Sequence, residues 1–223
     1  MHVRLFLVFL VLSLTGCDRP SNTTMVPPRA QDTQQQAMKN SLPPAAQSSY
    51  QFSPFHVYVD KGSRENHFIP SGFMPNGKCL SLNDRWINDC QSGNTCIQIA
   101  YDVNCSMNEE NWSGIYWLNP ANNWGNRKGG FDLAGAQKVT FWAKGAKGGE
   151  RIEEFKIGGI SGDYPDSDTA MIGPVILTNE WKQYAIDLRG KDLSYISGGF
   201  AWATNADVNP GECTFYLDNI QYE

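Results

Sequence analysis

Short β-rich stretches, separated by turn residues, recur through residues 51–223 and constrain the fold more than any other feature. Each stretch is rich in Val, Ile, Phe, Tyr or Trp, and clusters of Gly, Asn, Asp and Pro separate them at intervals of about 8–14 residues. Within 139–144 and 184–188, side chains suited to a core alternate with side chains suited to a partly solvated face. No long segment shows the helical period. The pattern predicts an all-β sandwich or barrel.

The first 17 residues carry the features of an export signal. A short basic start is followed by an apolar run at residues 5–14, which is too short to span a bilayer, and then by Leu-Thr-Gly-Cys at 14–17. That tetrapeptide resembles the bacterial lipobox, in which the signal is cleaved before a cysteine that is then lipidated. The resemblance implies an exported protein, held by acyl chains such as palmitate on Cys17 to a bacterial membrane, facing the periplasm or the cell surface.

The same features divide the chain into three parts. Residues 1–16 are predicted to be the signal peptide, 17–50 the lipidated cysteine and a flexible linker, and 51–223 the folded domain. The linker is rich in Gln, Ser, Thr, Pro and Ala and has almost no aromatic residues. It therefore cannot bury enough apolar surface to offset its chain entropy. The remainder has the size of one domain with an ample core.

The charge distribution argues against nucleic acid as a partner. Four of the 18 Lys and Arg residues and two of the 23 Asp and Glu residues precede residue 51, which leaves the domain with a net charge of about −7. No stretch is rich in Lys or Arg. A protein that binds a phosphate backbone needs such a stretch, and so does ionic adhesion to an anionic membrane.

Five cysteines follow Cys17, and an exported protein can keep disulfides. Cys90 and Cys96 are predicted to pair, because Ser-Gly-Asn between them favours a turn between two short strands. The odd number means that at least one thiol is free or pairs with another chain. The pairing of the other three is left open; they are Cys79, Cys105 and Cys213. The domain has no CxxC and only two His residues, so a zinc site is not expected.

The most unusual segment of the domain, residues 109–130, combines Trp and Tyr with several Asn residues. Sugars present flat C–H faces and rims of hydroxyls, so a sugar site needs aromatic platforms beside amide groups. Trp124 is the best candidate for a platform, because it lies in the predicted loop with no strand neighbour to cover it. Trp117, Asn122 and Asn123 are predicted to join it. In the alternative interpretation, strand residues such as Trp117 belong to the core and the Asn residues serve only turns.

A second candidate segment, residues 158–168, places three Asp residues on a glycine-rich turn. These carboxylates have the chemistry of calcium ligands, but they lack a specific calcium-loop motif. The segment is therefore interpreted as a solvated acidic turn. Alternatively, the carboxylates accept hydrogen bonds from sugar hydroxyls. Tyr164, Asp166 and Trp202 are predicted to be further neighbours of the sugar site.

Three phrases resemble the galactose-binding-like jelly rolls, which serve as carbohydrate-binding modules in bacterial polysaccharide-degrading systems. They are GFDLAGAQKVTFWAKG at 130–145, WKQY leading into AIDL at 181–188, and TFYLDNIQY at 214–222. The resemblance covers about residues 55–223 and implies a jelly-roll β-sandwich that binds a glycan. It also implies a structural calcium, with Asp218 as a ligand and Asp60 or Glu65 as further ligands. Alternatively, Asp218 pairs with a lysine or caps a turn.

The motifs that would indicate an enzyme are missing from the sequence. It has no GxSxG element, no cysteine with an evident His partner and no phosphate-binding glycine loop before a helix. Glu153 and Glu154 are adjacent, so on a strand they would point to opposite faces. The sequence therefore favours a non-catalytic binding protein. The alternatives are a lipoprotein that docks a protein partner in the cell envelope and a polysaccharide lyase or glycosidase on a sandwich scaffold.

Overall fold

The computed structural model describes residues 52–75, 77–105 and 110–223. The predicted signal peptide, Cys17 and the linker lie outside these residues, so the predictions made for them stay predictions. Within the described ranges, no helix is long and apolar enough to cross a membrane.

The described residues are all-β apart from one short 3₁₀ helix, η1 (Gly77–Cys79). The strands are β1 (Phe55–Tyr58), β2 (Ile69–Met74), β3 (Leu80–Trp86), β4 (Cys96–Tyr101), β5 (Trp112–Leu118), β6 (Lys138–Gly145), β7 (Arg151–Ile152), β8 (Glu154–Gly158), β9 (Thr169–Ile172), β10 (Val175–Ile176), β11 (Lys182–Asp187), β12 (Gly198–Asn205) and β13 (Cys213–Tyr222).

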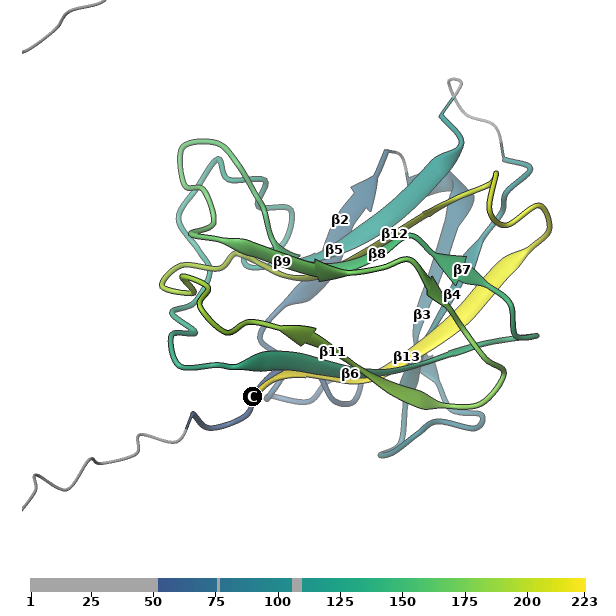
Figure 1. The fold of residues 1–223 in the computed structure, drawn as a ribbon, viewed down its shortest axis with the longest axis horizontal. Coiled ribbons are helices and arrows are strands. Elements are labelled where there is room, and N and C mark those ends of the chain that lie inside the picture. Colours follow the sequence, from purple (N-terminus) through teal and green to yellow (C-terminus); the bar gives the residue numbers. More distant parts are fainter. Residues whose placement is uncertain (1–51, 76, 106–109) are drawn as a thin grey trace, which may run out of the picture. The chain divides into compact units, whose positions relative to one another are not determined.

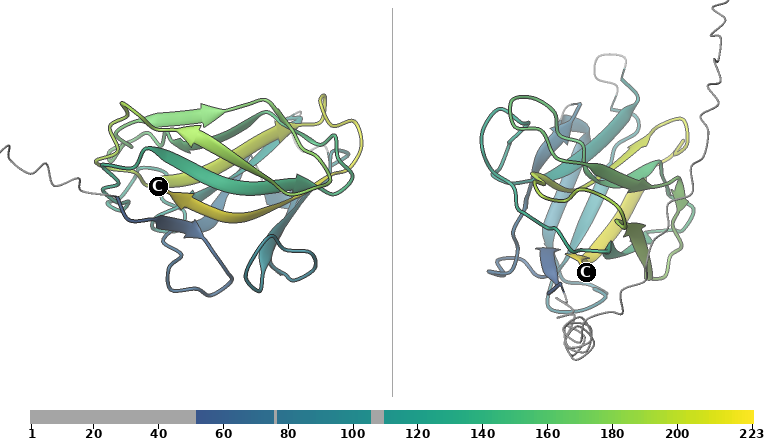
Figure 2. Two further views of the ribbon diagram at one scale, coloured as in Figure 1. Left: turned by 60° about the horizontal axis from the view of Figure 1, so that its bottom comes forward. Right: turned by 60° about the vertical axis from the view of Figure 1, so that its left-hand side comes forward.

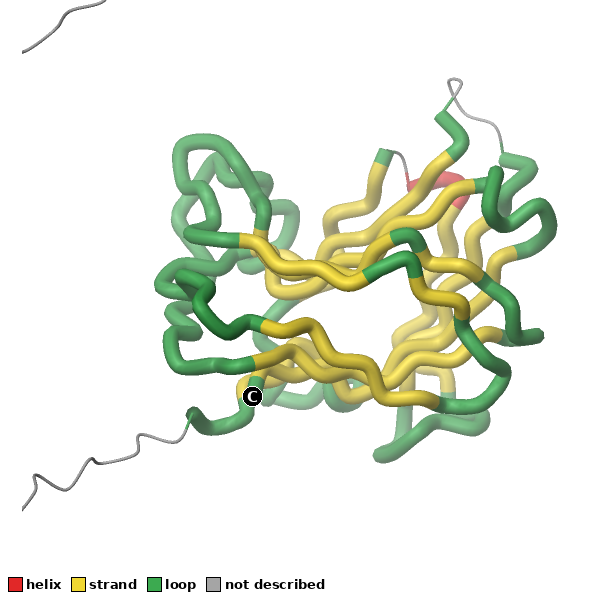
Figure 3. The backbone as a smooth tube through the Cα atoms, in the orientation of Figure 1, coloured by secondary structure: helices red, strands yellow, loops and turns green. Residues whose placement is uncertain are grey.

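Two antiparallel sheets face each other, as Figure 1 and the strand layers of Figure 3 show. The five-stranded sheet has the order β2-β5-β12-β8-β9, and the six-stranded sheet has the order β11-β6-β13-β4-β3, with β1 also paired to β13. A two-stranded ribbon, β10-β7, completes the fold. The arrangement is a jelly-roll β-sandwich, which confirms the predicted fold class.

Aromatic side chains from both sheets fill the space between them. Phe200 of β12 lies 5.1 Å, between ring centroids, from Phe141 of β6, and Trp202 lies 4.9 Å from Phe215 of β13. All four side chains are fully buried. Burial of such large apolar groups is the main force that holds the sheets together.

The domain contains two disulfides, Cys79–Cys105 and Cys90–Cys96. The second is the pair that the turn signal predicted, and the first settles two of the cysteines that the sequence left open. Cys213 is free and buried in the core. Burial raises the pKa of its thiol to about 12, so the thiol stays protonated and out of reach of a second chain.

Truncation of a core ring should show how strongly the two sheets depend on it. We expect Phe200→Ala to lower the free energy of unfolding by about 3–5 kcal/mol, because it removes buried contacts to both sheets and leaves a cavity. The control Ile176→Ala changes a side chain that is 63% exposed and should shift the same quantity by less than about 0.5 kcal/mol. Denaturant unfolding measures both; equal effects would contradict the assignment of Phe200 to the core.

Candidate functional site

Two of the predicted platform residues lie inside the sandwich, and the prediction that they contact a ligand is wrong. Trp117 and Trp202 are 0% exposed and belong to the core between the sheets. Because side chains alternate along a strand, Ile115 and Trp117 of β5 point inward together. Trp112 and Tyr116 of the same strand therefore point to the opposite side.

That opposite side is the outer face of the five-stranded sheet, which faces away from the six-stranded sheet. Strand register places Gly72 of β2, Tyr116 of β5, Ala201 of β12 and Lys156 of β8 side by side across it. Two residues along the same strands from Tyr116 and Ala201, Gly114 and Ala203 also lie opposite each other on this face. The Gly and Ala residues form a flat floor on this face, and six larger side chains project from it. These are Met74, Trp112, Tyr116, Glu154, Lys156 and Met171.

Trp124 lies on this face, as its prediction as a platform requires. Its ring centroid is 5.8 Å from that of Tyr116, at an angle of 78° between the planes, and the side chain is 43% exposed. A Cβ on Gly72 would lie 2.8 Å from the Cβ of Tyr116 and 3.0 Å from the Trp124 ring, so only glycine fits there without a shift of its neighbours. The indole thus rests on the sheet with part of its surface open to solvent.

Hydrogen bonds of two neighbouring Asn residues hold the loop that carries Trp124. Asn123 is fully buried, donates to the carbonyl of Asn119 and accepts from the N–H of Gly125. It is therefore a turn residue, and its prediction as a ligand contact is wrong. Asn122, in contrast, is exposed in the left-handed region (φ 58°), with its N–H donating to Ser71.

The loop that follows β8 packs against the Trp124 loop, at the end of the domain that Figure 2 (right) brings forward. The N–H of Tyr164 donates to the carbonyl of Gly125 at 2.9 Å, and the Tyr164 side chain stays partly exposed. Asp166 accepts from the N–H and hydroxyl of Ser197, and from the N–H groups of Ile160 and Gly198. All four bonds are internal, so Asp166 joins two segments of the chain. Its side chain is partly exposed, and its contact with a sugar stays a prediction.

An ion pair of a lysine and a glutamate lies beside the Tyr116 ring on this face. The Lys156 ammonium lies 5.4 Å from the centre of the Tyr116 ring and 3.7 Å from the Glu154 carboxylate. Partial burial works to lower the pKa of Lys156, but the contacts with Tyr116 and Glu154 outweigh it and raise the pKa. The lysine therefore stays charged. For Tyr116, burial acts in the opposite direction and raises the pKa of the hydroxyl, which donates to the carbonyl of Gly158 at 3.1 Å.

The two Asp residues predicted as calcium ligands lie under one turn, residues 91–95. Asp218 is fully buried and accepts from the N–H groups of Ser92 and Asn219. Asp60 accepts from the N–H groups of Asn94 and Thr95. Burial raises the pKa of Asp218 to about 6, and the charge of nearby Asp60 adds to the shift.

Asp60 and Asp218 are better placed than Glu65, the third predicted ligand, to hold a cation together. Lys61, next to Asp60 in the chain, pairs with Asp84 instead, so no lysine neutralises Asp60 or Asp218 among the described ion pairs. The Glu65 side chain is 68% exposed and lies 4.0 Å from His56. In the part of the chain that the structure describes, no three His, Cys, Asp or Glu residues gather around one point. A cation here would need main-chain or water oxygens to complete its coordination.

Comparison with known proteins supports the fold. No family model matches the chain, and no curated protein matches its sequence. The family 11 carbohydrate-binding module of a cellulosomal cellulase of Clostridium thermocellum matches with a TM-score of 0.52 and 14% identity, over 76% of this chain and 94% of that chain. A family 30 module matches with a TM-score of 0.49 and 16% identity, over 77% and 88%.

A further structure is a family 11 module from Clostridium thermocellum in complex with a β-1,3-1,4-mixed-linked tetrasaccharide. It matches with a TM-score of 0.40 and 14% identity, over 64% of this chain and 80% of that chain. At these identities, the likeness to the family 11 module with the TM-score of 0.52 shows the fold alone. The domain therefore has the jelly-roll fold of carbohydrate-binding modules, and its site must be argued from its own residues.

The raised pKa of Asp218 predicts a pH dependence of stability when divalent cations are chelated. The folded state holds this proton more tightly than the unfolded chain, so the contribution of Asp218 to the free energy of unfolding should fall as pH rises from about 4 to about 6. Carboxyls with lowered pKa values, such as Glu223, contribute with the opposite sign, so the effect of Asp218 is the difference between the unmodified protein and Asp218→Asn. The expected fall is about 3 kcal/mol for a shift of roughly two units. In denaturant unfolding, Asp218→Asn should change the pH slope by this amount, whereas Glu180→Gln, at an exposed carboxylate, should leave the slope of the unmodified protein unchanged. A slope unchanged in Asp218→Asn would contradict the assignment.

Proposed function

We propose that this protein is an exported, lipid-anchored, non-catalytic carbohydrate-binding protein that holds a polysaccharide on the outer face of its five-stranded sheet. The observation that carries the proposal is the exposed Trp124 ring packed on Tyr116, above a floor of Gly and Ala residues. An aromatic ring offers an apolar surface for the C–H face of a sugar, and its rigidity keeps the entropic cost of binding low.

The face has room for an extended chain and polar groups to orient it. Trp112, which is 36% exposed, projects from the same side of β5 as Tyr116, about 13 Å further along the strand. Lys156 and Glu154 of β8 lie on the other side of β12 from these rings, in register with Tyr116 and Gly114, and the Lys156 ammonium reaches the Tyr116 ring. Such groups exchange hydrogen bonds with sugar hydroxyls and thereby select one arrangement of hydroxyls over another.

We also propose that Asp60 and Asp218 bind a structural calcium ion together with main-chain oxygens. Burial raises the pKa of Asp218 although its carboxylate accepts two main-chain N–H bonds, so a nearby cation would favour its ionised form. A bound calcium ion would supply that positive charge. The two Asp residues would then hold the 91–95 turn in place, and the exposed Glu65 would take no part.

Export and anchoring belong to the same proposal. Acyl chains on Cys17 would hold the domain on a membrane surface, and residues 17–50 would give it a reach of roughly 30 Å. A polymer-binding domain on such a tether would concentrate polysaccharide at the cell envelope.

Affinity electrophoresis tests the glycan proposal. Gels would contain a mixed-linked β-1,3-1,4-glucan first, and then xylan and galactomannan. We expect one polymer to retard the protein, and Trp124→Ala to weaken that binding about 30-fold, the scale of roughly 2 kcal/mol for a key aromatic contact. Ile176→Ala, an exposed apolar residue on the β10 strand, is the matched control and should bind as the unmodified protein does.

Two other outcomes would contradict the proposal. A folded protein that no polymer retards would favour a protein partner in the envelope. Release of reducing ends or unsaturated products from a polymer would instead indicate a glycosidase or lyase.

Thermal unfolding tests the calcium proposal. Calcium at 100 times its dissociation constant should stabilise the folded state by about 2.7 kcal/mol, and the midpoint should rise accordingly relative to chelator. Asp60→Asn and Asp218→Asn should lose this response, whereas Glu65→Gln should keep it because that side chain is exposed and apart from the pair. A midpoint that does not respond to calcium in the unmodified protein would overturn the proposal.

A further inference from the structure

The outer face of the six-stranded sheet, on the opposite side of the sandwich, carries a second group of aromatic residues. Lys144 of β6, Tyr216 of β13, Gln98 of β4 and Asn83 of β3 lie side by side in register across four strands. Trp86 and Trp181 flank Tyr216, and Trp142 precedes Lys144 by two residues on the same side of β6. Each of these aromatic side chains is partly exposed.

The rings of this second group are held in fixed positions. The Trp86 and Trp181 centroids lie 5.6 Å and 6.5 Å from that of Tyr216. The ammonium of Lys144 lies 5.3 Å from the Trp181 ring and 5.1 Å from the Tyr216 ring, and it pairs with Asp89. These contacts remove side-chain freedom before any ligand arrives, which lowers the cost of binding.

Both indole N–H groups are bound to the 86–96 hairpin rather than left for solvent. Trp86 donates to the carbonyl of Asn88 at 2.7 Å, and Trp181 donates to the carbonyl of Asp89 at 2.8 Å. What the rings still offer is therefore apolar surface. A sandwich is held together by its inner faces, so the core does not require this outer aromatic surface.

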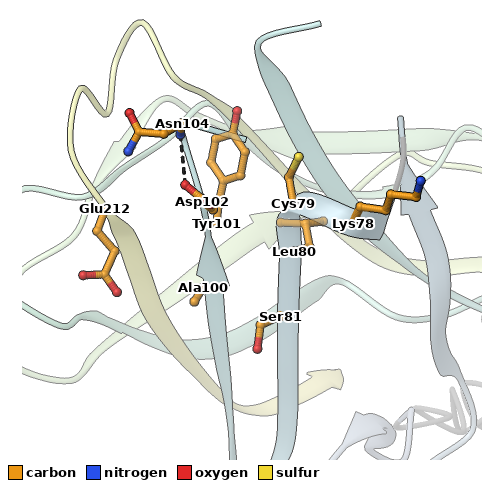
Figure 4. Close-up of a pocket in the computed structure, with 9 residues that line it drawn as sticks. All are labelled: Lys78, Cys79, Leu80, Ser81, Ala100, Tyr101, Asp102, Asn104 and Glu212. Carbon is orange, nitrogen blue, oxygen red and sulfur yellow. Dashed lines mark hydrogen bonds between the residues drawn. The ribbon is translucent and has the colours of Figure 1, made fainter. Parts of the chain in front are cut away.

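A polar pocket lies on the same face, two residues along β3 and β4 from Asn83 and Gln98. Ser81 and Ala100 form its floor, and Asp102, Asn104 and Glu212 contribute polar groups to its lining. In Figure 4, Ser81, Ala100 and Glu212 point to one side of the sheet, and Cys79 and Tyr101 point to the other. The step of two residues from Gln98 to Ala100 is about 7 Å, so the pocket begins one step beyond the row of Tyr216, and Trp86 and Trp181 lie on the other side of that row, toward the 86–96 hairpin.

We propose that this face is a second glycan-binding site, which binds an uncharged polysaccharide chain across Trp86, Tyr216 and Trp181 toward the pocket. The rings provide stacking surface, and Asp102, Asn104 and Glu212 provide partners for hydroxyls. The Lys144 charge is compensated by Asp89, which favours an uncharged chain. The inference extends the proposed function but rests on different residues. Two sites on opposite sides would let one molecule link two chains or grip one polymer with higher avidity.

The test separates the two faces by substitution, with the full chain and gels of mixed-linked β-glucan, xylan and galactomannan. We expect the Trp112→Ala, Trp124→Ala double variant to remain measurably retarded by at least one polymer. Adding Trp181→Ala should weaken this residual binding at least tenfold, whereas adding Ile176→Ala should leave it unchanged. Thermal unfolding confirms that each variant is folded.

Footprinting on the unmodified protein avoids any effect of substitution on folding. Hydroxyl-radical oxidation of Trp86 and Trp181 should decrease when the retarding polymer is present. Loss of all retardation in the double variant, or residual retardation that Trp181→Ala does not change, would overturn the second site and leave the first standing. Oxidation of Trp86 and Trp181 that the retarding polymer does not reduce would also overturn the second site. A lack of retardation of the unmodified protein by every polymer would overturn both.

Discussion

The alternation of side chains along each strand determines which aromatic residues of this domain can meet a ligand. In β5, Ile115 and Trp117 fill the space between the sheets, which turns Tyr116 toward solvent. In β13, Phe215 points inward, and Tyr216 faces out of the opposite sheet. The strands that build the core therefore also build both outer faces. Their rigidity comes from the close packing between the sheets, which fixes the backbone beneath each exposed ring.

The 86–96 hairpin connects two parts of the molecule that have different chemistry. Beneath it, Asp60 and Asp218 hold the 91–95 turn through its N–H groups. Above it, the carbonyl of Asp89 fixes Trp181, and Cys90–Cys96 closes the loop. The calcium ion that we propose at these two Asp residues would act on the same hairpin that holds the aromatic group on the six-stranded sheet. The face that carries Trp124 shares none of these contacts.

Sequence reasoning was right about the short disulfide and the exposed loop tryptophan. It was wrong about Asn123, which a turn buries, and about two strand residues whose orientation it could not decide. The Cys90–Cys96 pair and the exposed Trp124 follow from a short turn and a loop position. Trp117 and Trp202 were misplaced because β5 and β12 are apolar on both faces, so the pattern does not show which face is inner. The aromatic group around Tyr216 escaped notice because its members come from separate strands.

The sequence by itself determined the all-β class, the turns and the short disulfide, since each depends on residues close together in the chain. Only the tertiary structure decided which rings lie together. Trp124 packs on Gly72 and Tyr116, and the indole N–H of Trp181 donates to the carbonyl of Asp89, which is distant in the sequence. Such contacts depend on strand order and register, and a shift of one residue would exchange the inner and outer faces of a strand.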